Sequence, residues 1–394
     1  MKPLDDICII DLTRVLAGPF CTMLFADLGA NVIKVEAPKG DDSRTNPPFI
    51  NGESTYFMSL NRGKRSIVLD LKKEEAKEIL KKMVSKADVL VENFRPGTME
   101  KLGLSKETLI KINPELIFCS VSGFGQYGPY KERPAYDIVI QAMSGIMSIT
   151  GPASGSPTRV GASIGDITSG LFAAISILTA LHQRQRSGKG ECIDISMLDC
   201  MVAIIENAIV RHSATGVVPE PIGNRHPVST PFDMYPTKDS NLIIAIQNNN
   251  TWDHFCRAIN AEYLLEDVRF ESGASRTENE KSLKTILIDI LAGKTTNAWI
   301  DILLKAGVPC GPLYTIPDVV NDPHILAREM IITMKGHKKV PELKVAGSPI
   351  KLASQSYKLE KAAPVLGEHS CEILSEFGFS KDEIKEYSEK GLVG

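Results

Sequence analysis

Short apolar segments alternate with helical segments along the first 200 residues, and this alternation constrains the fold more than any other feature. Apolar runs typical of strands occur at residues 7–12, 31–36, 66–71, 89–94, 116–121 and 191–197. Helical patterns separate several of them, at residues 18–28, 73–87 and 99–112. Strands joined by crossover helices form a parallel sheet that is covered on both faces. The sequence therefore predicts a doubly wound α/β domain, whose ligands bind beyond the carboxyl ends of the strands.

A second, smaller unit is expected further along the chain. Buried helices are predicted first, at residues 137–149, 166–186 and 198–214. From residue 216 to 240 the composition changes to Pro, Gly, Asn and His, which is typical of a crossover between domains. A strand is predicted at residues 241–247, and helices follow at 252–259, 278–292, 296–306, 316–328, 366–377 and 381–390. The amides of residues 247–250 are interpreted as a cap for the helix at 252.

Charge, cysteine and histidine content argue against several classes of function. The 45 Lys and Arg residues face 48 Asp and Glu residues, so no basic surplus is available to bind nucleic acid. The eight cysteines are scattered and include no C-x-x-C pair, which predicts buried thiols in a reducing compartment. The seven histidines show no metal-site spacing, so we expect no metal site. Residues 1–10 do not resemble a signal peptide, and the apolar stretch 167–181 is shorter than the ~20 residues of a bilayer span. We therefore expect a cytoplasmic protein without a membrane partner.

A glycine motif after the predicted strand 116–121 matches the G-x-G-x-x-G pattern of dinucleotide-binding proteins. It consists of Gly123, Gly125 and Gly128. In those proteins the motif opens a helix whose N-terminus faces the pyrophosphate. Pro129 and Pro134 follow here, which does not favour the immediate start of a helix. We interpret the motif as a flexible glycine loop at the end of a strand.

Two other segments are unusual for a simple core. Residues 11–19 take a strand end into a helix with small residues at its start, and the free N–H groups of such a turn suit a phosphate or a pantetheine amide. Ordinary packing of a strand on a helix explains this segment equally well. Residues 161–170 place Asp166 among small residues before a buried helix. An aspartate in this position is most often an N-cap, and a catalytic role is the alternative.

Together, many segments resemble the class III CoA-transferases, the CaiB/BaiF or formyl-CoA/carnitine type. They follow the family's order from residue 5 nearly to the C-terminus, which is more specific than any single motif. The matching segments are residues 11–19, 29–36, 61–67, 69–72, 87–97, 122–126, 136–137, 165–166, 188–191, 223–227, 307–312 and 367–369.

The resemblance implies an interlocked homodimer in which each chain has a Rossmann-like large domain completed by its C-terminal segment. Residues 1–215 and 335–394 would form this CoA-binding domain. Residues 216–240 would be a linker, and residues 241–334 a smaller α+β domain with the return linker.

The resemblance also implies the chemistry. Asp166 corresponds to the family's nucleophile, which attacks an acyl-CoA thioester and passes CoA to a second acid through a mixed anhydride and an aspartyl-CoA thioester. Covalent catalysis of this kind divides one difficult exchange into smaller steps. Acyl-CoA and a small carboxylic acid are then substrates, and neither a permanently bound cofactor nor a metal ion is implied.

Ten further residues match positions that bind CoA in the family. Their cationic members suit the CoA phosphates, although a solvated surface is the alternative for some of them. They are Val15, Leu16 and Ala17 on the turn that approaches the nucleotide, Lys72, Asn93, Phe94, Arg95 and Lys101 on CoA-binding stretches, and Tyr136 and Asp137 beside the thioester arm.

Two other functions compete with CoA transfer. An α-methylacyl-CoA racemase has the same fold but carries His where Tyr136 stands, and a tyrosine with a pKa near ~10 is a poor general base at neutral pH. A non-catalytic CoA-binding protein is the other hypothesis, against which Asp166 argues.

The acids are not specified by the sequence. Formyl-CoA transferases carry a run of glycines that residues 223–234 lack, which argues against oxalate and formate as substrates. Carnitine-like betaines, short dicarboxylates and aryl or branched 2-hydroxy acids all remain candidates.

Overall fold

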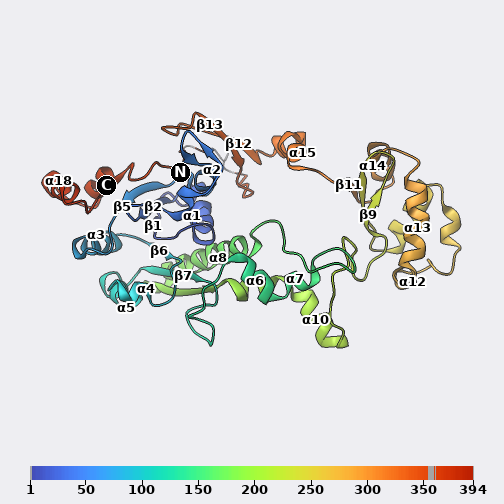
Figure 1. Ribbon diagram of the computed structural model, residues 1–394, viewed down its shortest axis with the longest axis horizontal. Coiled ribbons are helices and arrows are strands. Elements are labelled where there is room, and N and C mark those ends of the chain that lie inside the picture. The colour runs from blue at the N-terminus through green and yellow to red at the C-terminus, as the bar shows by residue number, and fades with distance from the viewer. Residues whose placement is uncertain (1, 354–358, 360, 394) are drawn as a thin grey trace. The chain divides into compact units, whose positions relative to one another are not determined.

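The chain divides into two compact units in the computed structural model, which describes residues 2–353, 359 and 361–393 (Figure 1). The larger unit comprises Met1–Ile146, Arg159–Gly216 and His324–Gly394. The smaller unit comprises Met147–Thr158 and Val217–Pro323.

A parallel sheet of six strands forms the centre of the larger unit, in the order β5-β2-β1-β6-β7-β8. Counted along the chain this order is 3-2-1-4-5-6, that of a doubly wound nucleotide-binding sheet, and it reverses direction between β1 and β6. The predicted α/β class is confirmed. The strands are β1 (Cys8–Asp11), β2 (Asn31–Glu36), β5 (Arg65–Val68), β6 (Val89–Glu92), β7 (Ile117–Ser122) and β8 (Glu191–Ser196).

Each face of this sheet has its own apolar core, because side chains alternate along a strand. Ile9 and Ile10 are both buried and belong to different cores. Side chains of α1 (Ala17–Asp27) and α8 (Ile164–Ser187) complete one core. The other core contains residues of α3 (Glu74–Val84), α5 (Lys106–Ile112), α17 (Ser370–Glu376) and α18 (Lys381–Glu389). The red C-terminal helices thus lie with the blue N-terminal strands, and α17 contacts β5 (Figure 1).

Shorter elements complete the larger unit. The helices predicted at 99–112 and 137–149 are each interrupted by a glycine with positive φ, Gly103 and Gly145, because a left-handed residue ends a helix. The hairpin of β12 and β13 was not predicted from the sequence. These elements are β3 (Phe49–Ile50), β4 (Glu53–Ser54), α2 (Thr55–Asn61), α4 (Thr98–Lys101), α6 (Asp137–Ser144), α9 (Met197–Ile204), α10 (Glu206–Thr215), β12 (Ile331–Lys335), β13 (Glu342–Ala346) and the 3-10 turn Asp42–Thr45. Two more helices cross from one unit to the other, α7 (Ile146–Ile149) and α16 (Pro323–Ala327).

The smaller unit packs helices on an antiparallel sheet of three strands, in the order β11-β10-β9. Asn248 caps its first helix, since the Asn248 side chain accepts a hydrogen bond from the Thr251 amide at 2.8 Å, which confirms the predicted cap. Strand β9 lies in the predicted linker; its buried positions are Asp233 and Tyr235, so no apolar alternation marks it. The elements are β9 (Phe232–Pro236), β10 (Asn241–Ala245), α11 (Asn249–Ala258), α12 (Gly273–Glu278), α13 (Glu280–Leu291), α14 (Thr296–Lys305), β11 (Cys310–Pro312), α15 (Ile316–Asn321) and the 3-10 turn Glu262–Leu265.

Helix α8 is longer than the apolar stretch recognised in the sequence. With 24 residues it is the one helix in the described part of the chain that is long and apolar enough to cross a membrane. Length and composition alone do not distinguish a membrane span from a core helix, and half of the apolar window of α8 is buried inside the fold. It contacts α1, β7 and β8, as a core helix does.

Candidate active site

Two loops leave the sheet where its strand order reverses, at the carboxyl ends of β1 and β6. One runs from Leu12 to Leu16 and enters α1, and the other begins at Asn93. The Asn93 side chain joins them: its Nδ2 donates to the Arg14 carbonyl and its Oδ1 accepts from the Arg14 amide, each at 2.8 Å. Ligands of doubly wound sheets bind at this point.

A cavity of about 300 Å³ opens beside these loops. Arg14, Lys131 and Arg133 add positive charge to its walls. The structure therefore gathers segments that are far apart in the sequence, and most of the predicted site residues are among them. The predicted residues that line this cavity are Val15, Leu16, Ala17, Asn93, Phe94, Arg95, Tyr136 and Asp166.

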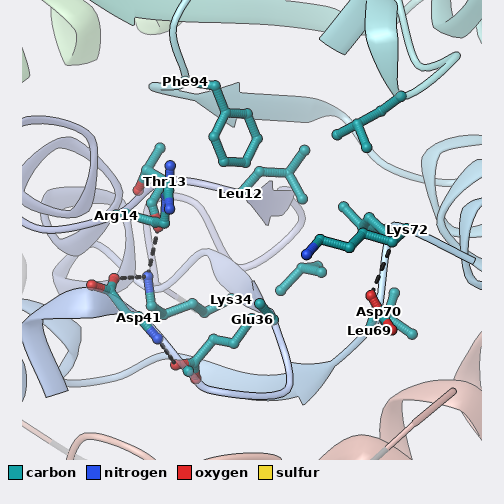
Figure 2. Close-up of a pocket in the computed structure, with 15 residues that line it drawn as sticks. Leu12, Thr13, Arg14, Lys34, Glu36, Asp41, Leu69, Asp70, Lys72 and Phe94 are labelled. Atoms are coloured by element: carbon teal, nitrogen blue, oxygen red, sulfur yellow. Dashed lines mark hydrogen bonds and ion pairs between the residues drawn. The ribbon is translucent and has the colours of Figure 1, made fainter. Parts of the chain in front are cut away.

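A second cavity of about 210 Å³ shares Arg14 and Phe94 with the first. Figure 2 shows Phe94 and Leu12 on one side of it and Leu69 and Lys72 on the other. Most of its lining is apolar, and Lys72, another predicted CoA-binding residue, adds a positive charge. A narrow apolar cavity with a few polar groups suits a flat heteroaromatic ring.

Asp166 is the third residue of α8, and a close helix contact places it beside the turn before α1. A Cβ atom on Gly170, one helical turn further on, would lie only 2.7 Å from the Ala17 carbonyl oxygen. Because Gly170 has no side chain, α8 can pack tightly against the start of α1. This packing brings Asp166 to the same cavity as Val15 and Leu16.

Burial and the nearby Asp137 carboxylate raise the pKa of Asp166 to about 7. Burial is the larger cause, since it disfavours the charged form. In the described part of the chain, no cation lies within ion-pair distance of the Asp166 carboxylate. A half-buried carboxylate that lines a cavity without a counter-ion is a candidate nucleophile or base.

The remaining predicted residues lie elsewhere or face away. Asp137 is buried, and its carboxylate accepts hydrogen bonds from the Gly165 amide at 2.8 Å and the Gln141 side chain at 2.7 Å. It therefore holds the start of α8. Lys101 ends α4 and lines neither cavity. The loop that begins at Gly123 opens no helix before α6, as expected for a glycine loop.

Comparison with known proteins identifies the family. The sequence pattern of the family described as "CoA-transferase family III" matches residues 4–370 of this chain. The chain belongs to CoA-transferase family III. It is 44% identical to an acetyl-CoA:oxalate CoA-transferase of Acetobacter aceti, covering 95% of this chain and 96% of that protein. It is 40% identical to a succinyl-CoA:mesaconate CoA-transferase of Haloarcula hispanica, covering 96% and 97%.

Other relatives agree with this assignment. A succinyl-CoA:glutarate CoA-transferase of Homo sapiens is 36% identical, with 95% of this chain and 86% of that protein covered. A crystal structure of a CaiB/BaiF family protein from Brucella suis superposes with a TM-score of 0.85 at 39% identity, covering 95% and 99%. The protein is an enzyme of the CoA-transferase type.

Tyr56 lines neither cavity, but its phenol is electrostatically coupled to Asp166, which no sequence motif indicated. It lies half-buried on α2, and burial together with the carboxylates of Asp166, Asp41 and Asp137 raises its pKa to about 12. The phenol therefore stays protonated at neutral pH. Sequence patterns could not reveal it, because its neighbours along the chain form an ordinary amphipathic turn.

A nucleophilic Asp166 would give this CoA-transferase a characteristic pH dependence, because the pKa of its carboxyl is raised. We expect kcat/KM for acyl-CoA to rise with pH through a midpoint near 7, because only the ionised carboxylate is a nucleophile. Asp137→Asn removes the like charge but keeps an oxygen that accepts from the Gly165 amide, so the midpoint should move to lower pH. Initial rates across pH 5–9 (a range of about two units on each side) measure this. An unchanged midpoint in Asp137→Asn would contradict the assigned cause.

In the residues that the structure describes, no group of three or more His, Cys, Asp or Glu side chains is arranged to hold a metal ion.

Proposed function

We propose that the protein transfers CoA from an acyl-CoA thioester to a free carboxylic acid, with Asp166 as the nucleophile. The observation that carries this proposal is the position of Asp166. Its half-buried carboxylate, with a pKa near 7, lines the same cavity as the turn Val15 to Ala17 and the loop that begins at Asn93. The activities named for the relatives support it.

CoA binding is assigned to the larger unit, to which all of these residues belong. The adenine ring would occupy the apolar cavity of Figure 2, with Lys72 near a phosphate. The pantetheine arm would then pass Val15 and Leu16 toward Asp166. The N-cap of α1 is Leu16, which has no side-chain acceptor for the amides of the first turn. Those amides suit the oxygen atoms of pantetheine or phosphate.

The exchange divides into balanced acyl transfers. A carboxylate oxygen of Asp166 attacks the thioester carbonyl and the carbon–sulfur bond breaks. CoA departs as a thiolate, and the acyl group remains on Asp166 as a mixed anhydride. The thiolate attacks the Asp166 carbonyl and releases the donor acid as a carboxylate, which leaves an aspartyl-CoA thioester. The acceptor carboxylate repeats these steps in reverse order, so the new acyl-CoA leaves and Asp166 is again ionised.

Each step passes through a tetrahedral oxyanion that hydrogen-bond donors stabilise. The amides at the start of α1 are the donors that the wall of the cavity offers. Water would hydrolyse the anhydride and the thioester, so the bound substrates must cover the half-buried Asp166 during the reaction.

We further propose that the acids are short dicarboxylates. Oxalate, mesaconate, glutarate and succinyl-CoA appear in the names of the relatives. Arg14, Lys131 and Arg133 line the cavity with Asp166 and could pair with a second carboxylate. Oxalate belongs in the test panel despite the missing glycine run, because the relative from Acetobacter aceti carries it in its name.

The homodimer and the cytoplasmic location are also proposed. Four helices of the larger unit expose large apolar side chains, which a second chain would cover, since monomers rarely expose large apolar patches. The eight cysteines are free thiols, which suits a reducing compartment. The exposed apolar residues on α6, α8, α9 and α10 are Ile138, Val139, Met143, Leu171, Ile175, Leu178, Val202, Ile204, Ile209 and Val210.

Covalent trapping tests the mechanism. After brief incubation with acetyl-CoA, succinyl-CoA or oxalyl-CoA, intact-protein mass spectrometry should show an acyl or CoA adduct that hydroxylamine removes from Asp166. The adduct should be absent from Asp166→Ala. Asp199→Ala is the matched control, because Asp199 is also the third residue of a helix but lies outside the cavity.

Three results would contradict this mechanism. An adduct that persists in Asp166→Ala would place the covalent step on another residue. No adduct with any thioester, together with tight CoA binding, would favour a non-catalytic CoA-binding protein. Exchange of the substrate α-proton with solvent deuterium, without an adduct, would favour a racemase.

A further inference from the structure

Hydrogen bonds from side chains, and not the backbone hydrogen bonds between strands, hold the segment from Thr13 to Val15. The Thr13 amide donates to Asp11 Oδ1 at 2.8 Å, and the Val15 amide donates to Asp41 Oδ1 at 3.1 Å. Between them, Asn93 occupies both backbone groups of Arg14 at 2.8 Å. The turn that leads into the cavity is thus fixed by groups from other segments of the chain.

Lys34 and Asp41 form the centre of this arrangement. Lys34 Nζ donates to the Thr13 carbonyl at 2.8 Å and pairs with Asp41 Oδ2 at 2.8 Å (Figure 2). Their side chains are 1% and 0% exposed. The pair therefore holds the turn on both sides of Arg14, through the Thr13 carbonyl and the Val15 amide.

A second buried pair lies behind the first. Lys64 Nζ contacts Asp11 Oδ2 at 3.0 Å and donates to the Pro19 carbonyl at 3.1 Å, and both charged side chains are fully buried. Asp11 in turn accepts from Thr22 of α1 at 2.7 Å. This pair ties the end of β1 to the first turn of α1, so the turn is fixed at both of its ends.

The turn has a conformation that it would not adopt alone. Val15 has a φ of 66°, in the left-handed region that a β-branched residue strongly disfavours. Buried charges are also unfavourable unless they are well paired. A strained turn held by two buried ion pairs is typical of a functional site whose geometry must be fixed before the ligand binds.

We propose that the Lys34–Asp41 pair and Asn93 are positioning residues for acyl-CoA: they hold the Arg14–Val15 turn in the conformation that receives the pantetheine arm. This inference rests on the proposed function and adds residues to it. It also gives Asn93 a different role from the direct contact predicted from the sequence, because both polar ends of its side chain are used by Arg14.

The test compares Asp41→Ala with Asp41→Asn. Alanine removes the acceptor of the Val15 amide and the partner of Lys34, whereas asparagine keeps an oxygen for the amide. We expect the KM for succinyl-CoA and the Kd for CoA to rise about tenfold in Asp41→Ala and less in Asp41→Asn. The kcat at saturating succinyl-CoA should stay within about twofold of wild type, since Asp166 is not displaced once the arm is bound.

Asn93→Ala and Asp27→Asn complete the design. Asn93→Ala removes the two hydrogen bonds between the Asn93 side chain and the Arg14 backbone. Asn93 lies on a partly exposed loop, so this variant tests the same turn if Asp41→Ala does not fold. The KM of Asn93→Ala for succinyl-CoA should also rise. Asp27→Asn breaks a comparably buried ion pair, Arg62–Asp27 at 2.7 Å, at the far end of α1. It should lower Tm and leave KM unchanged.

The outcomes separate the two proposals. A folded Asp41→Ala or Asn93→Ala enzyme with the KM of wild type would overturn the positioning role and leave the proposed function standing. A KM rise in Asp27→Asn equal to that in Asp41→Ala would show a general stability effect and overturn it as well. A wild-type protein that neither binds CoA nor exchanges it would overturn the proposed function itself.

Discussion

Replacing Asp166 by alanine is expected to lower kcat for CoA exchange by ~10³-fold or more, while the Kd for CoA changes by less than about twofold. Every covalent intermediate of the proposed cycle includes Asp166, so no other group can substitute for it. The Asp166 side chain lies at the wall of the cavity and is not part of the network that holds the Arg14–Val15 turn. Exchange of isotopic label between succinyl-CoA and free succinate measures the rate, and calorimetry measures the affinity.

Two further variants sharpen this prediction. Asp166→Glu keeps a carboxylate but moves it by one methylene, and a displacement of this size at a reacting centre costs roughly 10²-fold in rate. Asp199→Ala, at the equivalent position of α9, should exchange label at the wild-type rate. If Asp166→Ala keeps more than a tenth of the wild-type rate, Asp166 is not the nucleophile.

The parallel sheet was predictable because its central strands are buried on both faces, although the edge strand β8 is mostly exposed. The runs at 89–91 and 116–119 are wholly apolar, and a helix pattern separates them. The broken helices were less predictable: Gly103 and Gly145 end helices only because they take positive φ values, which composition does not reveal. Strand β9 was hidden by a buried polar residue, Asp233, whose carboxylate pairs with Lys284.

The candidate site was predicted mainly through the resemblance to the family. Residue types alone left Asp166 as an N-cap or a nucleophile. The N-cap expectation is wrong, because Ser163 is the N-cap of α8 and Asp166 is a residue of its first turn that lines the cavity. The roles of Asn93 and Asp137 could not be predicted, because a family match does not say whether a polar side chain faces the ligand or its own backbone. Both carboxylate oxygens of Asp137 and both polar atoms of Asn93 are used inside the protein.

The buried lysines show why part of the site escapes sequence analysis. Lys34 and Lys64 lie on or beside strands β2 and β5, where a lysine usually indicates a solvent-exposed position. Their burial depends on carboxylates that come from other segments, Asp11 and Asp41. A pairing between segments that are far apart in the sequence follows from the sheet order, which is known only after folding.

The contact between α8 and α1 gives the second large effect. Gly170→Ala should lower kcat/KM by roughly 10²-fold, because the added Cβ would lie 2.7 Å from the Ala17 carbonyl oxygen and must push the two helices apart. Alanine usually stabilises a helix interior by ~1 kcal/mol relative to glycine, whereas overpacking costs about 1–3 kcal/mol. Overpacking against a backbone atom should therefore dominate, and Tm should fall. Asp166 would then move away from the turn that carries Val15.

Gly161→Ala separates this effect from the general consequence of adding a methyl group near the site. A Cβ on Gly161 meets no atom within 4 Å, so this variant should keep the wild-type kcat/KM and Tm. A Gly170→Ala enzyme with wild-type kcat/KM would mean that the spacing of α8 and α1 does not set the position of Asp166. If kcat/KM falls while labelling of Asp166 by succinyl-CoA keeps its rate, the shift affects CoA binding and not the nucleophile. Measured together, kcat, KM and the labelling rate therefore show whether the contact between α8 and α1 controls CoA binding or the position of Asp166.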